Sequence, residues 1–106
     1  MEQAPSAESV EVVHVDASFE PLVPKFLTNR KKEVVTMREA LASQDFETVR
    51  TVAHGMKGAG GSYGFDRVSE LAAVIEQAAK TRDSSTIERD LPVLDSYLDR
   101  ITVVYD

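Results

Sequence analysis

The chain has 106 residues, 42% of them hydrophobic and 28% charged, which is typical of a single globular domain. It contains no cysteine, which excludes disulfides, zinc–thiolate sites and thiol catalysis. The net charge of −6 argues against a nucleic-acid-binding protein, and no apolar run approaches the roughly 20 residues that cross a bilayer. The start of the chain lacks the basic and apolar regions of a signal peptide, so we expect a cytoplasmic protein without membrane contacts.

The charges are unevenly distributed along the chain. Residues 1–24 hold five acidic residues and no Lys or Arg, and residues 83–106 hold six acidic and two basic residues. Residues 25–82 hold ten basic and seven acidic residues, a local charge of +3. A basic middle segment in an acidic protein suits an acidic protein partner better than DNA.

The beginning of the chain differs from the rest. Residues 5–9 show no periodic apolar pattern, and residues 10–16 have the composition of a short strand without an obvious hairpin partner. We therefore expect residues 1–15 to form a flexible or extended arm on a domain made by residues 16–106. Residues 18–23 predict a short helix or turn, which Ser18 would cap.

Two long amphipathic segments follow. The first spans about residues 24–43, and apolar residues recur in it every seven positions. The second begins near Phe46, after Asp45 as a cap, and ends near Tyr63, where Gly64 suits the left-handed position beyond a helix.

Two more helices complete the pattern. The first would begin with Asp66 as its cap, and the second would follow a capping box at residues 85–88. The last helix has an apolar seam that continues to Ile101, and Pro92 should kink this helix or mark its true start. The sequence thus predicts an all-α fold, an antiparallel up-down four-helix bundle with a short extra N-terminal helix.

The segment from residue 53 to 64 is unusual because four glycines, Gly55, Gly58, Gly60 and Gly61, lie within a predicted helix. Each glycine costs about 1 kcal/mol relative to alanine in a helix interior. Close packing against another helix explains Gly60, which lies on the buried stripe. It does not explain Gly58, which faces away from that stripe.

The opposite face of this helix carries residues spaced three and four apart, which therefore share one exposed stripe. A neutral imidazole is a nucleophile, a nearby lysine can neutralise a phosphoryl group, and a bare glycine backbone lets another protein approach. From these residues alone, a surface histidine without a role remains an alternative. The stripe consists of Arg50, Thr51, His54, Lys57, Gly58 and Gly61.

Other glycine-rich and metal sites are disfavoured. No strand precedes Gly58 and Gly60, as a dinucleotide-binding loop would require, and Lys57 precedes the glycines instead of following them as in a P-loop. The chain has only two histidines, His14 and His54, and no HExxH pair, so a metal site is not expected.

The run from Ala53 through His54, Gly55, Met56 and Lys57 to Gly58, followed by Gly64, resembles the alanine-histidine-x-leucine-lysine-glycine signature of histidine-containing phosphotransfer (HPt) domains. Met56 stands in place of the usual leucine. The resemblance extends over about residues 16–104.

The resemblance implies a role for each residue of the motif. His54 would be the phosphoacceptor at Nε2, Lys57 the cation that neutralises the phosphoryl group, and Gly58 the clearance for a partner. Arg50, Thr51 and Gly61 would complete the docking surface. Glu76, on the next helix, would hydrogen-bond the other nitrogen of His54 and leave Nε2 free to attack, although without the resemblance Glu76 would be interpreted as a surface carboxylate. His14 matches no motif position.

The resemblance also implies a function. The protein would accept a phosphoryl group on His54 from the aspartyl phosphate of a response-regulator receiver domain and pass it to another receiver, with a hybrid sensor histidine kinase as a further partner. It would be a monomer and a carrier, not an enzyme, without a cofactor of its own, because the receiver supplies Mg²⁺. Two alternatives are a regulatory module that binds a receiver or kinase without carrying phosphate, and the phosphate-accepting domain of a chemotaxis-type kinase.

The basic middle segment predicts how a partner is attracted. Lys25, Arg30, Lys31 and Lys32 cluster at the start of the first long helix, and Arg50 and Lys57 flank His54. We expect these charges to steer an acidic receiver toward the histidine, although a merely solubilising face explains the cluster of residues 25–32 equally well.

Overall fold

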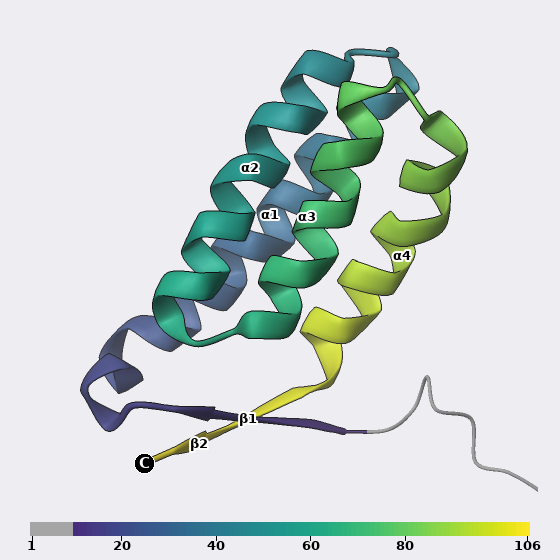
Figure 1. Ribbon diagram of the computed structural model, residues 1–106. Helices are drawn as coiled ribbons and strands as arrows, with labels where there is room; N and C mark the ends of the chain where they lie inside the picture. The colour runs from purple at the N-terminus through teal and green to yellow at the C-terminus, as the bar shows by residue number, and fades with distance from the viewer. Residues whose placement is uncertain (1–9) are drawn as a thin grey trace, which may run out of the picture.

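Four helices account for most of the computed structural model, which describes residues 10–106 (Figure 1). They are α1 (Val23–Ala42), α2 (Phe46–Tyr63), α3 (Asp66–Lys80) and α4 (Ser84–Arg100). Short loops join them, and consecutive helices run in opposite directions side by side (Figure 1). A short 3₁₀ helix, η2 (Ala17–Leu22), precedes them. The prediction of an all-α four-helix bundle with a short extra N-terminal helix is confirmed.

Both predicted ends of α2 are confirmed. The carboxylate of Asp45 accepts a hydrogen bond from the backbone N–H of Thr48 at 3.1 Å and another from its hydroxyl at 2.6 Å. At the other end Gly64 has a φ of 86°, a left-handed conformation that favours glycine because it has no Cβ.

Three other predicted caps are wrong. The carboxylate of Asp16, not Ser18, caps η2, and it accepts from the backbone N–H of Ser18. Asp66 lies inside the first turn of α3, which has no side-chain cap. The capping box at residues 85–88 is replaced by Asp83, which accepts from the backbone N–H and hydroxyl of Thr86, so α4 begins at Ser84.

The two ends of the described chain form a parallel pair of strands beneath the bundle (Figure 1). Strand β1 (Glu11–Val15) and strand β2 (Ile101–Tyr105) are aligned from Glu11 opposite Ile101 to Val15 opposite Tyr105. Residues 11–15 are thus extended and paired, whereas residues 1–9 of the predicted arm lie outside the described residues. The prediction that the last helix continues to Ile101 is wrong, because β-branched and aromatic residues favour the strand.

Pro92 does not mark the beginning of the last helix. It lies well inside α4, which continues on both sides of it.

The core lies between the four helices, and aromatic rings pack together at the end of the core near the turn from α2 to α3. Phe26 of α1 stacks on Phe65 with ring centroids 4.7 Å apart and also contacts Tyr63. Helices α2 and α3 lie in close contact at Gly60, where an added Cβ would lie 2.9 Å from the backbone nitrogen of Ser69. This close packing holds the exposed stripe of α2 beside one edge of α3.

None of the helices in residues 10–106 is both long and apolar enough to cross a membrane.

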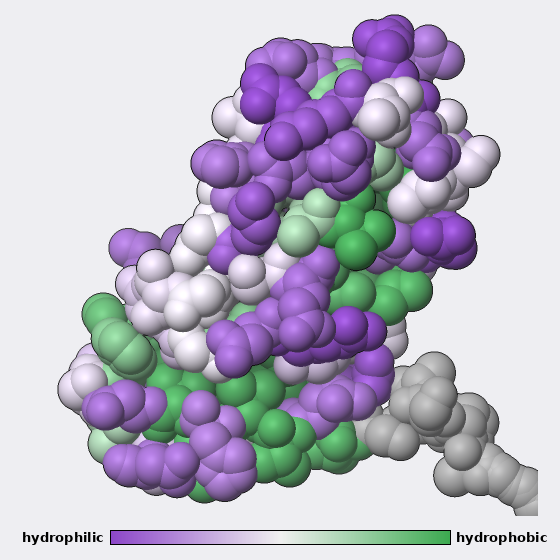
Figure 2. All heavy atoms as spheres, in the orientation of Figure 1, coloured by the Kyte–Doolittle hydropathy of each residue, from purple (hydrophilic) through white to green (hydrophobic). Residues whose placement is uncertain are grey.

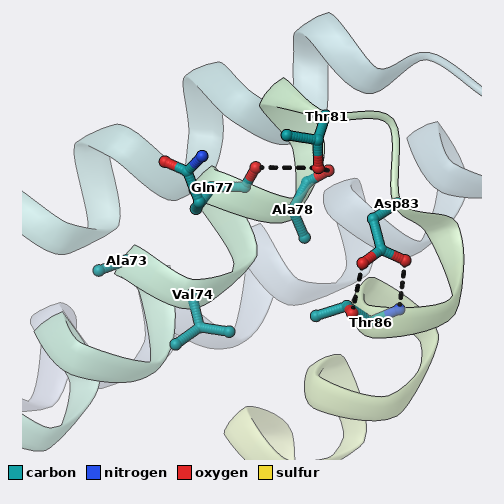
Figure 3. A pocket seen from close by; sticks show the side chains of 7 residues that line it. All are labelled: Ala73, Val74, Gln77, Ala78, Thr81, Asp83 and Thr86. Carbon is teal, nitrogen blue, oxygen red and sulfur yellow. Dashed lines mark hydrogen bonds between the residues drawn. The ribbon is translucent and has the colours of Figure 1, made fainter.

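A shallow groove of about 400 Å³ lies between the end of α3 and the beginning of α4 (Figure 3). Val74 and Gln77 line its α3 side, and Asp83 and Thr86, which form the cap of α4, line the other (Figure 3). The side chain of His54 does not line this groove.

Candidate functional site

His54 lies in the middle of α2 and faces solvent. Its neighbours Ala53 and Met56 are fully buried on the opposite stripe of the same helix, so the amphipathic pattern of α2 forces the imidazole outward. The His54 side chain is 67% exposed.

Glu76 of α3 is the only charged side chain that is buried in the part of the chain the structure describes. Its side chain is 6% exposed, and its two oxygens have separate partners. Oε2 lies 2.9 Å from Nδ1 of His54, and Oε1 lies 2.9 Å from Nζ of Lys57. Glu76 is therefore not the surface carboxylate that the residues alone suggested.

The charges around Glu76 keep its carboxylate ionised. The hydrogen bond from Lys57 lowers the pKa of Glu76 and outweighs burial, which acts in the opposite direction, and the hydrogen bond to His54 lowers the pKa further. Lys80, one turn further along α3, adds a second positive charge, with Nζ 3.9 Å from Oε2. A buried carboxylate is stable here because cations from both helices face it.

The contact with Glu76 determines which nitrogen of His54 is available. An ionised carboxylate can only accept hydrogen bonds, so the bond assigns the proton to Nδ1. Nε2 then carries the lone pair, and no side chain among residues 10–106 hydrogen-bonds it. The structure thus combines an oriented imidazole with an open nucleophilic nitrogen.

The glycines near His54 differ in what surrounds them. A Cβ added at Gly58 would meet nothing within 4 Å, and one at Gly61 would only touch the Ser69 hydroxyl at 3.9 Å. The internal packing of the protein therefore does not require glycine at position 58. The open surface there lies one turn from the imidazole.

The remaining stripe residues lie on the N-terminal side of His54. Thr51 is exposed one turn before it, and the guanidinium of Arg50 forms an ion pair with Glu47. Arg50 also lines a second pocket of about 490 Å³ between the beginning of α2 and the end of α3, together with Lys80 and Arg82.

Lys80 and Arg82 are further neighbours of the site that the sequence did not indicate. Lys80 follows Glu76 by four residues on one helix, a spacing that places the two side chains on the same face. Arg82 lies over the ring of Phe46, with Cζ 4.7 Å from the ring centroid. The contact between Arg82 and Phe46 joins distant parts of the chain, and no local pattern indicates it.

The basic residues of α1 lie elsewhere. Lys31 contacts Asp95 and Asp99 of α4, each at 2.7 Å, and Arg30 is paired with Glu33 at 2.7 Å. These charges face α4 or their own helix, whereas the imidazole lies between α2 and α3.

His14, the other histidine, lies on β1, with Nδ1 3.1 Å from Oδ2 of Asp106. Both side chains are more than 60% exposed, so an ion pair between them adds little stability. The structure does not bring His14 together with the other residues of the site.

Comparison with known proteins gives one match. The family model of the Hpt domain matches residues 21–102, which include His54, Lys57 and Glu76 but not His14. No curated protein and no solved structure gave a significant match. The family match covers most of the chain, and the four-helix bundle agrees with it. The chain therefore belongs to the Hpt domain family, whose members carry phosphoryl groups on a histidine in phosphorelays.

Proposed function

We propose that the protein accepts a phosphoryl group on Nε2 of His54 from the aspartyl phosphate of a receiver domain and passes it to a second receiver. The observation that supports this most directly is the 2.9 Å contact between Nδ1 of His54 and Oε2 of Glu76. It orients the ring from behind and leaves the exposed nitrogen for the reaction.

The transfer requires one bond to form and one to break. The lone pair on Nε2 of His54 attacks phosphorus, and the bond between phosphorus and the aspartyl oxygen breaks, which returns a carboxylate to the receiver. The ring keeps its proton on Nδ1 and becomes positively charged. The ionised Glu76 stabilises that charge because it is hydrogen-bonded to the same nitrogen.

Lys57 provides a positive charge for the incoming phosphoryl group. Its side chain is 40% exposed and lies one helical turn from His54, so its ammonium can approach an incoming phosphoryl group. Before transfer the ammonium is held by Oε1 of Glu76. The buried carboxylate thus keeps both the nucleophile and the cation in place.

Membership of the Hpt family supports the partners that we propose. A receiver domain with an acidic active site would supply the Mg²⁺, and a hybrid sensor histidine kinase would supply the phosphoryl group through its receiver. We place this exchange in the cytoplasm. Gly58 and Gly61 provide the open surface that a partner needs to bring its aspartyl phosphate to the imidazole.

A direct experiment is incubation with a receiver that carries labelled phosphate. We expect the chain to acquire a label that is labile in acid and stable in base, as a phosphohistidine is. His54→Gln should abolish this label, and His14→Gln, the matched control, should keep it. Label that persists in His54→Gln would refute the assignment, and receiver binding without any label would identify a binding module that does not carry phosphate.

A further inference from the structure

The edge of strand β2 has the properties of an interaction surface. Its five residues, Ile101 to Tyr105, include no charge, no proline and no glycine, and most are β-branched. In the part of the chain the structure describes, β2 pairs only with β1. Parallel sheets usually have more strands and covered faces, and a two-stranded sheet is marginally stable by itself. Figure 2 shows apolar side chains gathered at the base of the molecule, where Figure 1 places the strands.

The hydrogen bonds of β2 show which of its residues face the other edge. The backbone N–H of Asp106 donates to the carbonyl of Val15 at 2.9 Å, so Asp106 faces β1. In a parallel pair, alternate residues direct both backbone groups to the same neighbour. Ile101, Val103 and Tyr105 therefore direct their N–H and C=O groups away from β1.

Strand β1 contains an acidic residue and a histidine, Glu11 and His14, whereas β2 contains neither an acidic nor a basic residue. The partners of these two side chains, Arg100 at 3.0 Å and Asp106 at 3.1 Å, directly precede and follow β2. Charged side chains along an edge strand disfavour pairing with another chain. The uncharged edge of β2 is thus the better place for a further strand.

We propose that β2 pairs in antiparallel orientation with β2 of a second copy of this chain, about a twofold axis at Val103. In this register Val103 lies opposite Val103 of the second copy, and Ile101 lies opposite Tyr105. All three residues direct their backbone N–H and C=O groups to the edge of β2 that faces away from β1. Each of these groups therefore finds a hydrogen-bond partner in the second copy. Opposed β-branched and aromatic side chains stabilise such a pair, and none of the paired residues from Ile101 to Tyr105 is acidic or basic.

The proposed assembly closes at two copies. Each chain has one β2, and the outer edges of the resulting four-stranded sheet are the two charged β1 strands. The sheet lies beyond the end of α2, whereas His54 lies in the middle of that helix, so both imidazoles stay accessible (Figure 1).

The dimer should be weak. A pair of five-residue strands covers less than the roughly 800 Å² per partner of a typical stable interface. We therefore expect a Kd in the micromolar range or above.

Because the chain has no cysteine, one introduced cysteine can report on the interface without interference. In the proposed dimer the two Cα atoms at position 103 are about 5.5 Å apart, within the range that a disulfide spans. We expect Val103→Cys to form a disulfide-linked dimer under mild oxidation. Val13→Cys is the matched control, because Val13 is the neighbour of Val103 in the sheet and is equally half-buried.

The two copies of position 13 would be about three strand spacings, or about 14 Å, apart, too far for a disulfide. Val13→Cys should therefore remain monomeric. If Val103→Cys stays monomeric, or if both variants cross-link at the same rate, the proposed interface is wrong.

Sedimentation velocity on the unmodified chain gives an independent test. The average mass should rise toward that of a dimer as concentration increases. Val103→Lys and Val103→Glu should each be monomeric, because like charges would lie opposite each other, and their mixture should form a heterodimer. Circular dichroism checks that both variants keep their helices. A wild-type chain that stays monomeric, or two folded variants that fail to associate when mixed, would overturn the proposal.

Discussion

Glu76 connects the chemistry of the site to the packing of the helices. One oxygen faces His54 and the other faces Lys57, so a single buried side chain on α3 fixes two residues of α2. These contacts lie behind the imidazole, on the side away from an approaching partner. Glu76 is therefore a positioning residue, and its loss should affect transfer more than binding.

Glu76→Ala tests this separation. Without the carboxylate the imidazole loses its orientation and Lys57 its anchor, and misplacement of a reacting group by about 1 Å can slow a reaction about 100-fold. We expect single-turnover transfer from a phosphorylated receiver to slow by about 10- to 100-fold, with nearly unchanged receiver affinity. Gln77→Ala, at the exposed next residue, is the control and should transfer normally. An equal loss of affinity in Glu76→Ala would instead place Glu76 on the docking surface.

Gly58 and Gly60 should respond oppositely to the same substitution. A methyl group at position 58 meets nothing and improves helix propensity, so Gly58→Ala should raise the free energy of unfolding by up to about 1 kcal/mol. At position 60 the added Cβ would lie 2.9 Å from the backbone of Ser69, so Gly60→Ala should lower the free energy of unfolding. Urea denaturation measures the free energy of unfolding of both variants.

A larger side chain at position 58 tests the effect on transfer separately from the effect on stability. Gly58→Gln should fold as stably as the wild type and yet slow transfer, because it blocks the open surface beside His54. A variant that transfers at the normal rate would show that the partner does not approach there.

At the scale of elements, the beginning of α4 allows the observed capping residue, Asp83, to be compared with the predicted one, Ser85. Asp83 accepts two hydrogen bonds from Thr86, and its loss leaves a backbone N–H of the first turn without its partner. We expect Asp83→Ala to lower the free energy of unfolding by about 1 kcal/mol, as measured by urea denaturation. Ser85→Ala, at the cap predicted from the sequence, should change it by no more than a few tenths of a kcal/mol. Equal effects would support the predicted capping box.

The elements that the sequence predicts well are those with local signals. Helix α2 begins after Asp45 and ends before Gly64, as its capping residues indicate, and its apolar stripe places His54 on the exposed face. Such signals need only residues a few positions apart.

The features that the sequence could not predict depend on distant contacts. Strand β2 continues the apolar spacing of α4, so periodicity alone extends the helix to Ile101. Its strand partner, β1, lies at the opposite end of the chain. The burial of Glu76 likewise depends on Lys57 and His54 of another helix. Without the family resemblance, nothing in the sequence of α3 distinguishes this carboxylate from an exposed one.

At the scale of the whole molecule, folding divides the basic middle segment into two groups. On α1, Lys31 is engaged by Asp95 and Asp99, so the acidic last helix compensates part of the charge there. Lys80 and Arg82 lie with Arg50 around a pocket next to the site, where Glu47 is the only acidic lining residue. The positive field that a receiver meets near His54 should therefore come from the ends of α2 and α3 more than from α1.

This division predicts which charges steer a receiver. Removing Lys80 and Arg82 with a double substitution to Gln should lower the association rate constant about three- to tenfold at low salt. It should also flatten the salt dependence, because the Debye length falls from about 10 Å at 0.1 M to about 3 Å at 1 M and already screens these charges at high salt. The dissociation rate should change less, since charges at the rim of an interface act mainly on association.

The matched control removes the same charge from α1. Lys25 and Lys32 are exposed on that helix, and their double substitution to Gln should leave the association rate nearly unchanged. Stopped-flow binding of a receiver at several salt concentrations measures both variants, and thermal unfolding checks that both remain folded. If the α1 variant associates as slowly as the Lys80 and Arg82 variant, the sequence prediction is correct and the whole basic segment steers the partner. If only the α1 variant is slowed, the partner approaches over α1, and the pocket beside His54 has no part in docking.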